Sequence, residues 1–425
     1  MSNPKAAPIA ATTGLLDKKT AAFVFLTFAA AYSLSALVRA IIATLSPVLS
    51  AEFALQSRDL GLLAGGYFLG FAAMQLPLGS WLDRHGPKRV IVCFLAVAVL
   101  GCLAFSAATS FAGLLAGRVL IGMGVSACLM APLTGFRRWL GGPTLLRANS
   151  WMLMSGSLGM LASTLPVQWL LPLVGWRPMF WVLAALVLLA MVVIAWAVPP
   201  WQRDAEAASY NTEKPAGYAE VWRSRYFQKM SPLAFFNYGG LVAVQTLWAG
   251  PWMVTVCGYT PLEAATGLFC INALMLVTFW GWGLLNPRLS QAGWHTDRLM
   301  AWGVPLSLMV LAINIYSGTR TGWLGWAAFC MASTVISLSQ PAVGLSFKPA
   351  LAGRAMSAFN LVIFAGVFAV QWGIGLLVDA FAALGLAQVA SFQAAFSVFL
   401  CCCVGAYAYF LCVKADNSGL MNRTL

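Results

Sequence analysis

The segment Gly79-Ser-Trp-Leu-Asp83-Arg84-His-Gly86-Pro-Lys88-Arg89 is a short charged turn between two long apolar runs, residues 58–80 and 89–108. Each run is about as long as the roughly 20 apolar residues that a helix needs to cross a bilayer. A basic turn between two such runs predicts a loop at a membrane surface that joins two spanning helices.

The composition of the whole chain is that of a polytopic membrane protein. Hydrophobic residues make up 61% of the 425 residues and charged residues only 9%, against roughly 25% charged residues in a soluble domain. We therefore predict an all-α membrane protein with twelve transmembrane helices, at 21–46, 58–80, 89–108, 111–135, 148–171, 176–198, 230–253, 263–286, 298–316, 322–345, 354–377 and 390–413.

The positive charge is distributed unevenly about these spans. Twenty basic residues fall on one predicted side, and only Arg58, Arg177 and Arg320 fall on the other. Basic loops mark the cytoplasmic side, so we expect a multi-pass protein of a bacterial-type inner membrane with both termini in the cytoplasm. The net charge of +13 is then a topology signal, and we expect the lipid bilayer and no nucleic acid as a partner.

One polar stretch, residues 201–229, divides the predicted spans into six and six. We expect a tail at 1–20, a bundle at 21–198, a cytoplasmic loop at 199–229, a second bundle at 230–413 and a tail at 414–425. Within the loop, Tyr218–Gln228 is either an amphipathic helix on the inner leaflet or a solvated linker with a helical turn. Two such halves predict a central cavity at their interface.

The charged turn resembles the signature loop between the second and third helices of major facilitator superfamily transporters. The matching residues are Gly79, Asp83, Arg84, Gly86, Lys88 and Arg89. Arg118-x-x-x-Gly122 in the fourth span is similar to a second motif of the superfamily. The resemblance implies two six-helix pseudo-repeats and alternating access, with Asp83 pairing with basic residues of the other half. The alternative is an ordinary charged loop that fixes topology.

Two arginines, Arg39 and Arg118, lie inside apolar runs, whereas all twelve acidic residues lie near helix ends, in loops or in tails. An intramembrane cation faces a cavity or a partner. At 1.5 Å per residue, both arginines lie roughly 10–12 Å from the outer ends of their helices. This arrangement predicts an anion-binding site. For Arg118, the alternative is a structural role in which it donates hydrogen bonds to carbonyls where helices cross.

Further candidate substrate contacts are polar or aromatic residues of the spans, namely Tyr32 and Ser35 on the helical face of Arg39, and Tyr67, Asn237, Gln245 and Asn360 elsewhere. Tyr32 and Arg39 before Pro47 resemble the first helix of organophosphate/phosphate antiporters, whose matching residues contact phosphate. The seventh span lacks the second arginine of those antiporters. Organic-anion symporters also place arginines in helices 1 and 4, although Val125 stands where they carry an acid.

The sequence therefore predicts a monomeric secondary transporter of a small organic anion, a carboxylate or phosphonate, without a cofactor. The first alternative is an exporter of drugs or other hydrophobic compounds, although the glycine–proline step of drug antiporters is absent from the fifth span. A membrane enzyme is disfavoured because no HExxH motif, buried carboxylate pair or metal-ligand spacing occurs. A sensor or scaffold that does not transport is a third alternative.

Overall fold

The computed structural model of the chain describes residues 15–201 and 217–413. Most of the two predicted tails and the middle of the predicted loop lie outside these residues. Every element in the described ranges is a helix, which confirms the predicted all-α class. The first half comprises α1 (Lys18–Phe53), α2 (Ser57–Ala73), α3 (Gln75–Ala107), α4 (Phe111–Val125), α5 (Ala127–Trp139), α6 (Gly142–Ala162), α7 (Leu165–Val174) and α8 (Trp176–Ala197).

The second half begins with α10 (Tyr218–Arg223) and α11 (Arg225–Leu233) and continues through the short segments η1 (Ala234–Tyr238), α12 (Gly239–Ala243), η2 (Val244–Trp248), α13 (Ala249–Pro251) and η3 (Trp252–Val256). The remaining elements are α14 (Pro261–Gln291), α15 (Thr296–Ser317), η4 (Gly318–Arg320), α16 (Trp323–Ser333), η5 (Thr334–Leu338), α17 (Ser339–Leu345), α18 (Pro349–Ala383) and α19 (Gln388–Cys412).

Among the described residues, nine helices are long and apolar enough to cross a membrane. A tenth span results if the pair α6 and α7, bent by 44° at their junction, is counted as one. The predicted span 58–80 falls on α2 and the start of α3, and the span 230–253 falls on the segments from α11 to η3. Both paths are interrupted, so the count of twelve stays a prediction.

The charged turn of the sequence lies inside α3, where the chain changes direction. Gly86 has φ 76° and ψ 164°, a conformation that glycine adopts without steric strain. Pro87 follows and restarts the helix, since proline is tolerated in a first turn. Gly86 therefore separates the part of α3 that leads to Asp83 from the part that carries Lys88 and Arg89. We call the end of the molecule at this turn the inner end and the opposite end the outer end.

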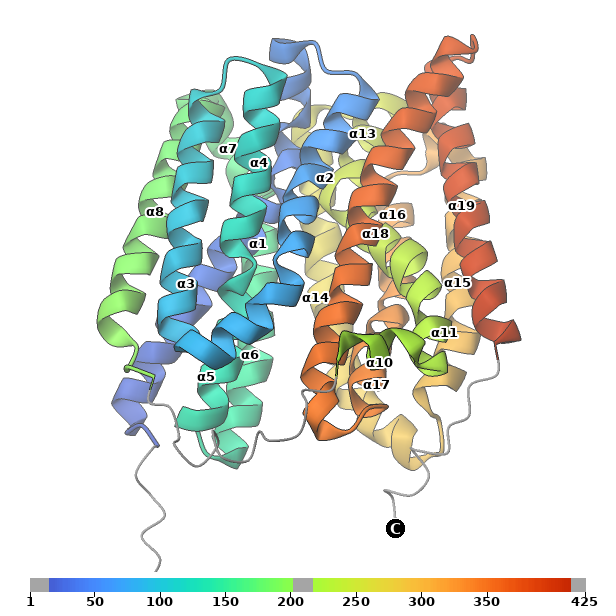
Figure 1. Cartoon of the computed structure of the whole chain (residues 1–425). Helices are drawn as coiled ribbons and strands as arrows, with labels where there is room; N and C mark the ends of the chain where they lie inside the picture. Colours follow the sequence, from blue (N-terminus) through green and yellow to red (C-terminus); the bar gives the residue numbers. More distant parts are fainter. Residues whose placement is uncertain (1–14, 202–216, 414–425) are drawn as a thin grey trace, which may run out of the picture.

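The two halves meet along α2 and α18, which lie side by side between them (Figure 1). Glycines allow this close approach. A Cβ at Gly61 would overlap the carbonyl of Gln371, and a Cβ at Gly375 would overlap the carbonyl of Ser57. Small residues let membrane helices pack backbone to backbone. At the outer end, Gly250 of α13 also faces the carbonyl of Ala43 in α1.

The segment Tyr218–Gln228 forms two helices that are separated at Ser224. Val221 of α10 is fully buried in a cluster with Phe227 and Phe359, and α10 packs against α18 (Figure 1). Neither expectation for this segment, a single amphipathic helix or a solvated linker, describes it. Burial of the apolar face against protein explains the difference.

Candidate functional site

Arg118 lies in α4 and is completely buried. Its Nη1 donates to the carbonyl of Val38 at 2.7 Å, and its Nη2 donates to the carbonyl of Arg39 at 3.4 Å. Its guanidinium carbon also lies 5.1 Å from the ring centre of Tyr67, a cation–π contact. The two arginines therefore lie at a similar depth in the first half, as the sequence predicts. These bonds favour the structural interpretation of Arg118, and its contact with substrate stays a prediction.

Arg39 lies in α1 and is only partly buried. Its guanidinium interacts electrostatically with the hydroxyl groups of Tyr67, Tyr32 and Tyr238 and with the thiol of Cys128. Its Nε is buried and has no hydrogen-bond acceptor among the described residues. No described carboxylate lies within ion-pair distance of Arg39. The arrangement is a cation surrounded by hydroxyl groups that can donate hydrogen bonds to a common acceptor.

Aromatic side chains extend from this site across the interface between the halves. The ring of Tyr67 stacks on Phe71 with the ring centres 6.0 Å apart. Phe71 in turn contacts Phe364 of α18 at 4.4 Å, and Phe68 stacks on the same Phe364 at 6.1 Å. These four residues form an aromatic wall beside Arg39, to which both halves contribute.

The seventh predicted span, whose helix is irregular, carries Tyr238 close to Arg39. η1, η2 and η3 are π-helical turns of five residues each. Each π turn changes the direction of the following side chains relative to a regular α-helix, and such turns occur frequently at functional sites. Tyr238 ends the first of them. Its neighbour Asn237 points elsewhere and donates to the carbonyl of Cys403 in α19 at 3.3 Å.

The other predicted contacts fall into two groups. Ser35 is buried near the site, and its carbonyl accepts a long hydrogen bond of 3.5 Å from the hydroxyl of Tyr67. Gln245 donates to Asn272 at 2.8 Å, and Asn360 accepts from Gln340 at 2.5 Å. The structure thus brings Arg39, Tyr32, Ser35 and Tyr67 together. Asn237, Gln245 and Asn360 instead bond to neighbouring helices within the second half.

Sequence reasoning did not place Tyr238, Cys128 and Phe364 in the site. The only available signal was the position of Tyr238 next to Asn237 in a polar patch of the seventh span. The residue pattern does not show which of these two neighbours faces Arg39. Cys128 and Phe364 lie in apolar runs, and Phe364 is one of 26 phenylalanines.

At the inner end, the charged turn faces the second half. Asp83 interacts electrostatically with Arg354 of α18, and a Cβ at Gly79 would lie 3.8 Å from Ser357 Oγ. Tyr218 of α10 donates to the carbonyl of Leu76 at 3.2 Å. Burial raises the pKa of the Tyr218 hydroxyl, which keeps it a donor. An ion pair between Asp83 and a basic residue of the other half stays a prediction.

At the outer end, Asp379 of α18 connects the halves. Its Oδ1 accepts from the backbone N–H of Ser57 at 3.1 Å, and its Oδ2 accepts from that of Arg58 at 2.8 Å. These N–H groups are at the amino terminus of α2, where a helix has free donors and a partial positive charge. Asp59 accepts from the N–H of Gln56 at the same terminus, within the first half. A carboxylate of one half therefore caps a helix of the other.

Comparison with known proteins shows the family. The model described as Major Facilitator Superfamily matches residues 28–370, so the chain belongs to that superfamily. Among curated proteins, the chain is similar to the Multidrug resistance protein MdtL of Escherichia coli O81 (strain ED1a), with 25% identity over 328 residues, 69% of this chain and 82% of the relative. MdtL of Escherichia coli O45:K1 (strain S88 / ExPEC) shows 25% identity over 332 residues, with the same coverage of both chains.

Solved structures agree on the fold. The inward-facing, unoccupied structure of a bacterial homologue of the human lysosomal transporter Spinster has a TM-score of 0.77 at 16% identity, covering 93% of this chain and 97% of that one. The structure of the D-xylose–proton symporter has a TM-score of 0.75 at 14% identity, covering 94% and 99%. The family and the fold are those of membrane transporters.

Proposed function

We propose that this member of the superfamily carries a small organic anion, a carboxylate or phosphonate, across the inner membrane by alternating access, with both termini in the cytoplasm. The observation that supports the anion is Arg39, whose Nε is buried without an acceptor and which has no described carboxylate partner. A partly buried cation without a counter-charge is unfavourable, and a bound anion would supply the missing charge.

The groups around Arg39 favour an oxyanion. A guanidinium presents several N–H donors in one plane and binds carboxylates and phosphonates through paired hydrogen bonds. The tyrosines that interact with Arg39, namely Tyr32, Tyr67 and Tyr238, add hydroxyl donors from the first, second and seventh predicted spans. Because Tyr238 belongs to the second half, the anion would contact both halves at once, as alternating access requires.

The aromatic wall favours an anion with an apolar or aromatic body. Phe71 and Phe364 lie next to Tyr67, so a carboxylate held by Arg39 would place its body against these rings. Aromatic rings provide large apolar contact surfaces. A sugar phosphate would need polar partners there, whereas Asn237 and Asn360 are both bonded to neighbouring helices. A polar phosphate ester therefore fits this site less well than an aromatic carboxylate.

Export of hydrophobic drugs is the second candidate function. It is favoured by the same aromatic wall and by the similarity to relatives that are named as multidrug resistance proteins. The two candidates differ in the charge of the substrate. Arg39 and Arg118 both carry a positive charge, so they repel a lipophilic cation and attract an anion.

The test is a ligand panel on the purified full-length protein. Thermal unfolding is measured with aromatic carboxylates, phosphonates, sugar phosphates and lipophilic cations, and each stabilising compound is then assayed for uptake into proteoliposomes. We expect stabilisation and uptake with organic anions. Stabilisation and uptake by cations alone would support the drug exporter and reject the anion transporter.

A further inference from the structure

At the inner end, a recess of about 630 Å³ is lined by Arg84, His85, Lys88, Arg89, Pro200 and Trp201. We propose that this recess binds a phosphate group, carried by the head group of an anionic phospholipid or by a soluble phosphate ester. The recess is separate from Arg39 and does not rest on the proposed transport function. It uses four basic residues of the charged turn, namely Arg84, His85, Lys88 and Arg89.

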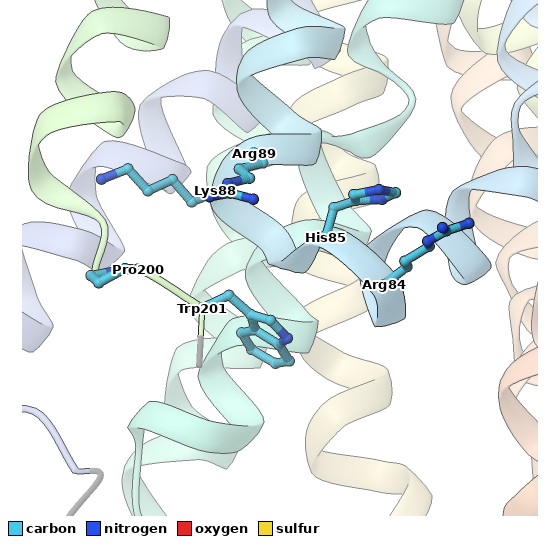
Figure 2. Close-up of a pocket in the computed structure, with 6 residues that line it drawn as sticks. All are labelled: Arg84, His85, Lys88, Arg89, Pro200 and Trp201. Carbon is cyan, nitrogen blue, oxygen red and sulfur yellow. The ribbon is translucent and has the colours of Figure 1, made fainter. Parts of the chain in front are cut away.

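The charge of the lining favours an anion. Two guanidinium groups, one ammonium group and one imidazole border the recess, and none of its six lining residues is acidic. Figure 2 shows the four basic side chains spread along the turn of α3, with the indole of Trp201 below it. Phosphate oxygens accept strong charge-assisted hydrogen bonds from arginine and lysine. A cluster of this kind provides several donors to one ligand.

The floor of the recess has a defined position. A Cβ at Gly86 would overlap the side chain of Trp201, so the indole packs directly on this glycine. The ring of Trp139 contacts Trp201 edge to face at 6.5 Å. The guanidinium of Arg138 lies 5.0 Å from the centre of the Trp201 ring and brings a further cation to the border of the recess. Elements from both sides, α3 and α5, thus hold Trp201 in place.

The location favours a lipid over a soluble compound. The recess lies where α8 ends and the second part of α3 begins, so it is at the predicted boundary between the membrane and the cytoplasm. Tryptophan is enriched at such boundaries. Basic pockets between helices on the cytoplasmic side bind lipid head groups, and each lysine or arginine strengthens the attraction to anionic lipid. The experiment below distinguishes the two sources of phosphate.

The full-length protein is purified and titrated with short-chain phosphatidylglycerol, phosphatidylcholine and glycerol 3-phosphate, and bound ligand is counted by native mass spectrometry. The test variant is Lys88→Gln/Arg89→Gln. The matched control is Arg288→Gln/Arg298→Gln, which removes two exposed arginines from the inner end of the second half. Of these, Arg298 also stacks on a tryptophan, Trp294, at 4.5 Å.

We expect phosphatidylglycerol to bind the unaltered protein and the control more tightly than phosphatidylcholine does, and the test variant to bind it roughly 10- to 30-fold more weakly. Equal binding by glycerol 3-phosphate would assign the recess to a soluble phosphate ester. Unchanged phosphatidylglycerol binding by the test variant would overturn the proposal. Because that variant changes the charged turn, His85→Gln and Lys88→Arg are measured as well. We expect phosphatidylglycerol to bind His85→Gln more weakly and to bind Lys88→Arg as tightly as the unaltered protein. An equal loss of binding in both variants would also overturn the proposal.

Discussion

The guanidinium of Arg118 donates a hydrogen bond to the main-chain carbonyl of Arg39, and a shorter one to the preceding carbonyl of Val38. One buried arginine thus holds the turn of α1 that carries the other. The two arginines differ in what their side chains contact: Arg118 contacts backbone and the ring of Tyr67, whereas Arg39 faces tyrosine hydroxyls. We infer that Arg118 positions the site and Arg39 binds in it.

The first prediction concerns stability without substrate. Arg118→Gln removes a charged donor to two buried carbonyls, and a hydrogen bond that involves a charged group contributes about 1.5–3 kcal/mol. We expect a clearly lower unfolding temperature for Arg118→Gln. Arg39→Gln removes a partly buried charge that has no carboxylate partner among the described residues, so its unfolding temperature should stay equal or rise, as is common for site residues. Thermal unfolding of both variants in one detergent makes the comparison.

Arg320→Gln is the control for this comparison, because it removes an exposed arginine at the outer end. A loss of stability in Arg39→Gln as large as that in Arg118→Gln would show that both arginines are structural.

The second prediction concerns Tyr238. Tyr238→Phe keeps the ring and removes the hydroxyl that faces Arg39. A neutral hydrogen bond contributes about 0.5–1.5 kcal/mol, so we expect roughly 2- to 10-fold weaker binding of the transported anion with little change in stability. Tyr316→Phe, at a tyrosine that is 90% exposed, is the control. Equal affinity in both variants would place Tyr238 outside the site.

Residue patterns predicted the site residues that come from the first half of the protein but not those that come from the second half. Arg39 and Arg118 were identifiable because charges within apolar runs are rare and have few explanations. Tyr32 and Tyr67 followed from helical periodicity and polarity. Tyr238 could not be chosen over Asn237, because the two are adjacent residues with polar groups in an apolar run and the residue pattern does not show which one faces Arg39. Amides such as Asn360 resemble ligands in the sequence, but they bond to other helices in the structure.

The third prediction concerns the outer end. Asp379→Asn keeps the shape of the side chain and removes the charge that caps the amino terminus of α2. We expect the outer ends of the two halves to separate more often. Spin labels at Ala54→Cys and Leu384→Cys report this separation by double electron–electron resonance, with the exposed Cys93, Cys401 and Cys412 replaced by serine.

Asp59→Asn is the matched control for Asp379→Asn. It removes a carboxylate from the same helix terminus but leaves the contact between the halves intact. An equal increase in the labelled distance for both variants would mean that helix capping alone, and not the bond across the interface, is responsible.

The fourth prediction concerns the close packing of α2 and α18. Gly375→Val should open the outer end, because a side chain there overlaps the carbonyl of Ser57. Gly373→Val, two residues earlier and with open space around it, should have no effect. The readout is labelling of Ala43→Cys by an impermeant maleimide added from outside. Equal labelling of the two valine variants would contradict the packing argument.

The fold class could be predicted from the sequence more fully than the exact bounds of the helices. Apolar run lengths and the motif from Gly79 to Arg89 predicted the helical class and the superfamily. The helix boundaries were less predictable, because the break between α2 and α3 at Met74 and the bend between α6 and α7 fall inside runs that the apolar pattern alone shows as continuous spans. Asp379 bonds to the amino terminus of α2 at Ser57 and Arg58, which precede it by 322 and 321 positions in the sequence. Local sequence patterns carry no information about contacts over such a separation.

The central claim is that Arg39 binds the substrate anion. Its most direct test is equilibrium binding of the strongest anion from the ligand panel to the unaltered protein, Arg39→Gln and Arg320→Gln, measured by titration calorimetry. A charge-assisted hydrogen bond contributes about 1.5–3 kcal/mol, so we predict at least roughly 10-fold weaker binding to Arg39→Gln and unchanged binding to Arg320→Gln. Equal affinity in all three proteins would contradict the claim.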